Sequence, residues 1–271
     1  MPAQRSSAAK LAARAWVEVS DLLDLQLSPL GLRAIDALAP VPGEIIVDIG
    51  CGAGQSTVQL AARVGPTGRV IGLDIAPELL AVARHRSTAL PQLSFVEGDA
   101  ALAHLPDQSI DGLFSRFGVM AFADPIAAFA NFRRMLKPSG RLAFVCWRAL
   151  ADNELDLLPI QSAGLDAKID ATPFSFADPT HIRHVLETAG FQHVTVSPHD
   201  EMVSSGTADD MATVLLRVGP LGKILRENPD LLATAEPRLR AALAHRTNHG
   251  QVSLNAATWI VTADQVISGS G

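Results

Sequence analysis

Residues 44–54 read EIIVDIGCGAG, an apolar run that ends beside an acidic residue and passes directly into three alternating glycines. The apolar run predicts a buried strand over residues 44–49, because short runs bounded by turn residues are typical of parallel sheets. The glycines at 50, 52 and 54 predict a tight turn in which the backbone can approach a ligand closely. Since open α/β sheets bind ligands at the carboxyl ends of their strands, the stretch predicts a ligand site at this turn.

The spacing of the glycines favours one class of ligand over another. A dinucleotide-binding turn has the pattern Gly-x-Gly-x-x-Gly, and here Gln55 occupies the last position. Asp48 lies two residues before the first glycine, where a carboxylate is a poor neighbour for a pyrophosphate and a good one for an ammonium or sulfonium group. A nicotinamide-dependent oxidoreductase is therefore the less favoured interpretation.

Two further acidic residues follow strand-like runs downstream of the turn. Asp74 ends the run 69–74, about twenty residues past the glycines, where a carboxylate can accept both hydroxyls of a ribose. Asp99 follows the run 93–97 and could accept a hydrogen bond from an adenine amino group, with the Ala100 N–H beside a ring nitrogen. Each acid alone could be a helix cap. Together with Asp48, in register with successive strand–helix units, they indicate a nucleoside-containing ligand.

The rest of the chain alternates between predicted strands and helices. We expect strands over residues 69–74, 93–97, 110–115, 141–146, 191–197 and 257–262. We expect helices over residues 11–38, 56–64, 77–86, 125–136, 178–189 and 208–245, the last one interrupted by prolines, whereas 150–177 shows little periodicity. This pattern predicts an α/β fold with a mostly parallel sheet covered by helices on both faces. The expected parts are N-terminal helices (1–39), a core (40–150) and a C-terminal part (151–271) with a helical insert at about 205–250.

Composition restricts the classes of partner. The chain has 271 residues, 48% hydrophobic content and a net charge of -6, which allow a large core and disfavour nucleic acid as a partner. Residues 1–16 lack the apolar region of a signal peptide, and no apolar run is long enough to span a membrane. Cys51 and Cys146 are far apart, so neither a metal site nor a disulfide framework is expected, and a reducing cytoplasm is favoured. The sequence is compatible with a homodimer.

The glycine turn and the three acids together resemble the class I S-adenosylmethionine-dependent methyltransferases, and more narrowly the group related to ubiquinone and menaquinone biosynthesis. Two more stretches carry the resemblance: FSRFGVMAF at 114–122, after the fourth strand, and KPSGRL at 137–142, where Ser139 replaces the first glycine of the family's turn. The resemblance is strong over residues 40–150. It implies a Rossmann-like, doubly wound sheet of seven strands, one of them antiparallel.

The resemblance also implies a cofactor, S-adenosyl-L-methionine, and a product, S-adenosyl-L-homocysteine. It places Gly50 and Gly52 against the methionine part, Asp48 on its amino group through water, Asp74 on the ribose and Asp99 on the adenine. Thr57 or Ser56 could reach the cofactor carboxylate from a helix N-terminus, Ile75 could pack on the adenine, and the Ser115 carbonyl would face the methionine. The residues expected at the cofactor are Asp48, Gly50, Cys51, Gly52, Gly54, Thr57, Asp74, Ile75, Asp99, Ala100 and Ser115.

The acceptor side is less defined by the sequence. The candidates for the substrate pocket are Trp16, Arg116, Phe117, Met120 and Trp147, each of which could equally be a core or surface residue. No catalytic base is identified, and the chain contains no tyrosine that could act as one. We expect a methyltransferase acting on a small, partly apolar metabolite. The alternatives are a regulatory protein that binds the cofactor without catalysis, or a polyamine synthase on the same fold.

Overall fold

The computed structural model describes residues 6–265. Their contacts form two compact units, each assembled from three chain segments. The helical unit comprises residues 6–29, 149–171 and 200–257, and the sheet unit comprises residues 30–148, 172–199 and 258–265. The boundaries expected at residues 39 and 150 treat each part as one continuous segment, whereas the chain passes repeatedly between the two units.

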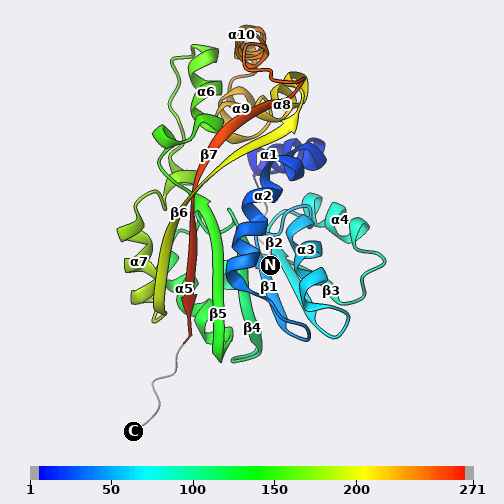
Figure 1. Ribbon diagram of the computed structural model, residues 1–271, viewed down its shortest axis with the longest axis vertical. Coiled ribbons are helices and arrows are strands. Elements are labelled where there is room, and N and C mark those ends of the chain that lie inside the picture. The colour runs from blue at the N-terminus through cyan, green and yellow to red at the C-terminus, as the bar shows by residue number, and fades with distance from the viewer. Residues whose placement is uncertain (1–5, 266–271) are drawn as a thin grey trace. The chain divides into compact units, whose positions relative to one another are not determined.

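A seven-stranded sheet has the order β3-β2-β1-β4-β5-β7-β6, which Figure 1 shows with its strands labelled. The strands are β1 (Ile45–Ile49), β2 (Arg69–Asp74), β3 (Leu93–Glu97), β4 (Ile110–Arg116), β5 (Leu136–Trp147), β6 (Gln192–Gly206) and β7 (Val252–Asp264). Strands β1 to β5 pair in parallel, and β7 pairs with β5 in the antiparallel direction. The predicted α/β class and seven-stranded, mostly parallel sheet are confirmed.

Within residues 6–265, four α-helices lie wholly in the sheet unit, namely α3 (Gln55–Val64), α4 (Pro77–Arg86), α5 (Pro125–Met135) and α7 (Pro179–Thr188). Two of them, α5 and α7, begin at side-chain caps. Asp124 accepts a hydrogen bond from Ala127 N at 2.9 Å, and Asp178 accepts one from Thr180 N at 2.8 Å. In both helices proline occupies the first position, where no backbone N–H is needed. These signals explain why the predicted starts of α5 and α7, at residues 125 and 178, agree with the structure to within one residue.

A cluster of phenylalanines forms much of the core of the sheet unit. Phe129 and Phe132 of α5 pack edge to face at 5.6 Å between ring centroids, and Phe144 of β5 lies 5.7 Å from Phe129. The ring centroids of Phe176 and Phe191 each lie 6.3 Å from that of Phe129, so this one ring of α5 packs against two aromatic residues from later segments of the chain. Burial of these rings fixes α5 on β5, because each removes a large apolar area from water.

The helical unit contains one element that the sequence analysis missed. Its helices are α1 (Ser7–Glu18), the first part of α2 (Ser20–Leu38), α6 (Glu154–Ala163), α8 (Ala208–Leu215), α9 (Gly219–Glu227) and α10 (Leu232–Ala244). The expectation of little regular structure over 150–177 was wrong for α6. Pro159 lies within α6, and a proline inside a helix weakens the sequence signal for that helix. The stability of α6 comes from tertiary contacts with α9 and α10 rather than from local propensity.

Other differences concern the ends of elements. The helical region expected over 11–38 begins earlier, at Ser7, and consists of two helices that are separated at Val19. Strands β6 and β7 are longer than the expected 191–197 and 257–262. Among residues 6–265, no helix combines the length and hydropathy needed to cross a membrane.

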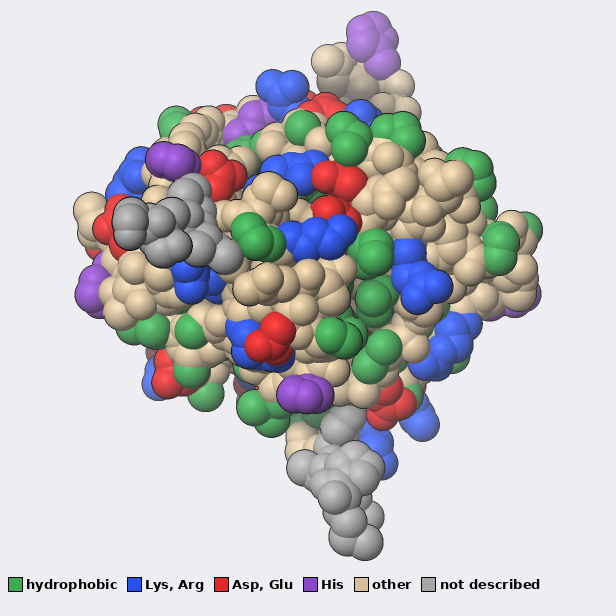
Figure 2. All heavy atoms as spheres, turned by 90° about the horizontal axis from the view of Figure 1, so that it is seen from below, with side chains coloured by type: hydrophobic (Ala, Val, Ile, Leu, Met, Phe, Trp, Pro, Cys, Tyr) green, Lys and Arg blue, Asp and Glu red, His purple; other side chains and the backbone are tan. Residues whose placement is uncertain are grey.

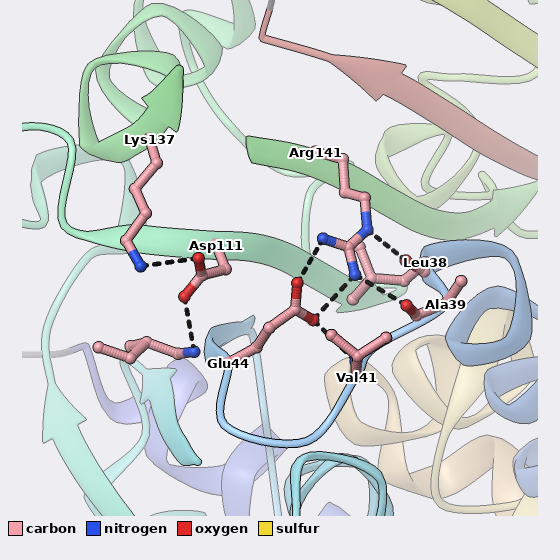
Figure 3. Close-up of polar contacts among 8 residues, drawn as sticks. Leu38, Ala39, Val41, Glu44, Asp111, Lys137 and Arg141 are labelled. Carbon is pink, nitrogen blue, oxygen red and sulfur yellow. Dashed lines mark hydrogen bonds and ion pairs between the residues drawn. The ribbon is translucent and has the colours of Figure 1, made fainter. Parts of the chain in front are cut away.

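Polar contacts join the segments at the amino-terminal ends of the strands (Figure 3). Arg141 of β5 donates to both carboxylate oxygens of Glu44, at 2.8 and 2.9 Å, and to the carbonyls of Leu38 and Ala39. Lys137 and Asp111 pair beside them (Figure 3). We call these residues the amino-end cluster. Figure 2, turned from Figure 1 to be seen from below, shows positive and negative side chains interspersed over the visible face.

Candidate functional site

The glycine turn is held between two neighbouring segments. Gly50, Gly52 and Gly54 have φ angles of 68°, 55° and 85°, a region that favours glycine. A Cβ on Gly50 would lie 2.7 Å from Gly118 Cα, and one on Gly54 would lie 2.8 Å from Ala83 Cβ. A Cβ on Gly52 would meet nothing within 4 Å. The outer glycines are thus required by packing, while Gly52 leaves backbone facing open space.

Asp48 is completely buried next to this turn. Its Oδ2 accepts hydrogen bonds from Ser56 Oγ at 2.8 Å and from Thr57 Oγ1 at 2.7 Å, both in the first turn of α3. Its Oδ1 has no hydrogen-bond partner among the described residues. Burial raises the pKa of Asp48 to about 6, although the two hydroxyls oppose this shift. A buried carboxylate oxygen without a partner is costly, and a water or a polar ligand group that reached it would remove this cost.

Asp74 ties the end of β2 to the glycine turn. Its Oδ2 accepts a hydrogen bond from Gly52 N, and its Oδ1 accepts one from Ala76 N, each at 2.8 Å. The N–H groups of Gly50 and Cys51 donate to the carbonyl of Leu73 at 2.8 and 3.0 Å. The first two acids predicted from the sequence therefore belong to one hydrogen-bonded assembly around the turn.

Asp99 lies at the end of β3 in an exposed position. It caps the short helix Ala100–Leu102, and its Oδ1 accepts a hydrogen bond from Ala101 N at 2.9 Å. Asp99 therefore acts as a helix cap, one of the two roles that the sequence allowed for it. Ile75, directly after β2, is 56% exposed. It therefore offers an apolar surface next to Asp74, which ends β2.

The ends of β1 and β4 are clamped together by Ser115 and Gly118. Ser115 Oγ donates to the carbonyl of Ile49 at 2.7 Å and accepts a hydrogen bond from Gly118 N at 3.0 Å. A Cβ on Gly118 would overlap the Ile49 carbonyl oxygen and would lie 2.9 Å from Gly50 Cα. The importance of Gly118 was not recognised in the sequence, where the only signal was a glycine shortly after the fourth strand.

The substrate-pocket candidates have different positions. Phe117 and Trp147 stack on each other, with 4.0 Å between ring centroids and 15° between ring planes. Arg116 donates a hydrogen bond to Gln55 Oε1, at the start of α3, a contact that the sequence did not predict. Met120 is buried with the hydrophobic core of the sheet unit. Trp16 belongs to α1 of the helical unit and is 38% exposed.

The two cysteines are buried free thiols. Burial raises the pKa of Cys51 and of Cys146 far above the ordinary value, so both thiols stay protonated and unreactive. Cys51 is a small buried residue of the turn, as predicted. The described residues contain no group of three or more His, Cys, Asp or Glu side chains that could hold a metal ion.

These features fit S-adenosylmethionine. The unpartnered Oδ1 of Asp48 suits the ammonium group of the cofactor, the open backbone at Gly52 allows close approach, and Ile75 offers an apolar surface to the adenine. Asp74 can accept further hydrogen bonds, because each carboxylate oxygen has a second lone pair. The hydroxyls of Ser56 and Thr57 both donate to Asp48, and the contact of either one with the cofactor carboxylate stays a prediction.

Comparisons with known proteins agree with this geometry. A family model described as "Methyltransferase domain" matches residues 47–144. The 2-phytyl-1,4-naphtoquinone methyltransferase of Thermosynechococcus vestitus is 38% identical over 179 residues, which cover 61% of this chain and 80% of that protein. The aklanonic acid methyltransferase DauC of Streptomyces sp. (strain C5) is 36% identical over 119 residues, 43% of this chain and 54% of that protein. The chain thus spans only about half the length of this second relative.

A solved structure supports the fold independently of sequence. The YcgJ protein of Bacillus subtilis superposes with a TM-score of 0.58 at 18% identity, covering 88% of this chain and 98% of that one. At this identity the likeness concerns the arrangement of helices and strands alone.

Proposed function

The chain belongs to the class I S-adenosylmethionine-dependent methyltransferases, and from this premise we propose that it methylates a small, partly apolar metabolite. The observation that carries the proposal is the unpartnered, buried Oδ1 of Asp48 beside the glycine turn. The aromatic residues Phe117 and Trp147, which follow or end the adjacent strands β4 and β5, supply the apolar surface for an acceptor.

The residues of the turn would bind and orient the cofactor. Asp48 would accept from the ammonium group directly or through water, Gly50 and Gly52 would lie along the methionine part, and Asp74 would hold the ribose hydroxyls. Because the carboxylate of Asp48 is kept in place by Ser56 and Thr57, it needs little reorganisation when the ligand binds. Asp99 and Ile75 would contact the adenine.

The bound cofactor supplies an activated methyl group on a sulfonium sulfur. The protein's contribution would then be to align the acceptor with the methyl group and to exclude water. Aromatic faces also stabilise the positive charge that spreads during transfer. The two relatives are named for a naphthoquinone and for aklanonic acid, and these names support an organic, partly apolar acceptor.

Isothermal titration with S-adenosylhomocysteine tests the first half of the proposal. We expect binding to one site, and a protein that is folded but does not bind would contradict the proposed function. The second half is tested by incubating the chain with methyl-labelled cofactor and a metabolite extract. Label transferred to a small molecule supports an enzyme, whereas binding without any transfer supports a regulatory protein instead.

The setting of the protein is also a proposal. Both cysteines are buried thiols, and this favours a reducing compartment such as the cytoplasm. We propose no nucleic acid, membrane or metal partner. We also propose that the chain can form a homodimer, and size-exclusion chromatography with light scattering would measure its mass in solution.

A further inference from the structure

Phe117 and Trp147 form a parallel aromatic pair at the end of the sheet where the glycine turn lies. Trp147 is the last residue of β5, and Phe117 directly follows β4. Phe117 N donates to the carbonyl of Val145 at 3.0 Å, so the pairing of the two strands continues up to the rings. Both side chains are half-buried, so part of the pair is accessible to a ligand.

The backbone at Phe117 is held in an unfavourable conformation. Its φ angle is 62°, which is rare and strained for a bulky residue. The conformation persists because Gly118 is packed against Gly50 and the Ile49 carbonyl, while the ring stacks on Trp147. Strain of this kind concentrates at functional sites, and here it places the aromatic ring next to the glycine turn.

Resting on the proposed function, we propose that the Phe117–Trp147 pair is the platform on which the methyl acceptor lies, and that this acceptor is a planar ring carrying an ionised oxygen. A planar ring that lies on the accessible part of the pair would extend the parallel stack, and a stacked ring contributes a large share of a small ligand's affinity. A non-planar molecule makes far less contact with such a face.

The charges next to the platform favour an anion over an amine. Arg116 directly precedes Phe117, and Arg148 directly follows Trp147 with its guanidinium 5.2 Å from the centre of the Trp259 ring. Both side chains have partners within the protein. Asp48 and Asp74 lie at the same end of the sheet, but the two arginines directly adjoin the rings in the chain, and their positive charges favour an anion there.

The chemistry of the edge also favours an oxygen that is already ionised. The chain contains no tyrosine, and Cys51 is kept protonated by burial. Asp48 accepts from two hydroxyls through Oδ2, and in the proposed function its Oδ1 is used by the ammonium group of the cofactor. An ionised acceptor reacts without a base. A lone pair of its oxygen forms the new O–C bond, the C–S bond breaks with its electron pair left on sulfur, and the negative and sulfonium charges cancel without release of a proton.

The test measures binding of 2-hydroxy-1,4-naphthoquinone, a planar enolate at neutral pH, to the full chain saturated with S-adenosylhomocysteine. Cyclohexanecarboxylate serves as a non-planar anion and tryptamine as a planar cation. We expect the enolate to bind about tenfold more tightly than either comparator, the discrimination that one stacked ring gives. Equal binding of cyclohexanecarboxylate, or tighter binding of tryptamine, would overturn the proposal.

Variants connect this binding to the stacked pair. Phe117→Asn removes the ring while keeping a residue that tolerates the positive φ, and Trp147→Leu removes the other ring. Each should weaken enolate binding about tenfold and leave affinity for S-adenosylhomocysteine unchanged, whereas Phe117→Tyr and Trp147→Phe should retain it. Enolate binding that is absent from the wild type, or insensitive to both ring deletions, sinks the inference. Loss of S-adenosylhomocysteine binding in the wild type would instead count against the proposed function.

Discussion

A carboxylate lies near each end of strand β1, and the two differ in their hydrogen bonding and in the direction of their pKa shifts. Glu44, just before the strand, accepts hydrogen bonds from Arg141 and from Val41 N, and these outweigh its burial and hold its pKa below the ordinary value of 4.5. Asp48, near the other end, keeps one oxygen unpartnered, and burial raises its pKa to about 6. The amino end of the sheet satisfies its polar groups internally and stabilises the fold. The carboxyl end leaves Asp48 Oδ1 unsatisfied, which is a cost that a bound ligand can remove.

The largest expected effect comes from breaking the amino-end cluster. Arg141→Leu should lower the free energy of unfolding by about 3 kcal/mol, because it leaves a mostly buried Glu44 without its charged partner. The carbonyls of Leu38 and Ala39 lose their donor as well. Urea denaturation measures the loss. Arg141→Lys should recover part of it, and affinity for S-adenosylhomocysteine should not change in either variant. A large loss of affinity would show that the two ends are not independent.

Asp48→Asn should have the opposite effect on stability. The pKa of Asp48 is raised from 3.8 to about 6 on folding, so its ionised form destabilises the protein, and this penalty appears as pH rises through 6. At pH 8 we expect the variant to be more stable than wild type by up to about 3 kcal/mol. The difference should shrink toward zero as pH falls toward 4. Denaturation curves of both proteins at these two pH values measure it, and a variant less stable at pH 8 would contradict the assignment.

The same substitution should weaken the cofactor. A charged hydrogen bond to the ammonium group is worth about 2 kcal/mol, so S-adenosylhomocysteine should bind about 30-fold less tightly to Asp48→Asn. In the wild type, affinity should fall about tenfold between pH 7 and pH 5, because most Asp48 is protonated below a pKa of about 6. The variant should show no such dependence. Parallel titrations at pH 5, 6 and 7 separate Asp48 from other groups.

Lys137→Met is the smallest expected change. Lys137 Nζ lies 2.7 Å from Asp111 Oδ1, but the lysine side chain is 38% exposed, and exposed pairs contribute 1 kcal/mol or less. Asp111 also keeps its hydrogen bond from Ile45 N at 2.9 Å. We expect a loss in urea denaturation of about 0.5 kcal/mol, and a loss equal to that of Arg141→Leu would show that the whole cluster acts as one unit.

Elements bounded by strong local signals could be predicted from the sequence alone. The strands at 69–74 and 93–97 and the helix at 77–86 agree with the structure to the residue, because turn residues and a proline mark their ends. The glycine turn and its neighbouring acids could also be predicted, because positive φ angles require glycines and the acids lie at or near the ends of apolar runs. The helix α6 was not readable, because its stability comes from neighbours far away in the sequence.

By itself, the sequence determined the α/β fold, the glycine turn and the acids that end or follow the first three strands. Only the tertiary structure decided how these groups are used. It gave Asp48 two hydroxyl partners and one unpartnered oxygen, linked Asp74 to Gly52, and stacked Phe117 on Trp147. The physical reason is the distance along the chain over which each kind of interaction acts. Turn and cap preferences act over a few residues, whereas burial and hydrogen bonding between segments depend on where the whole chain places each group.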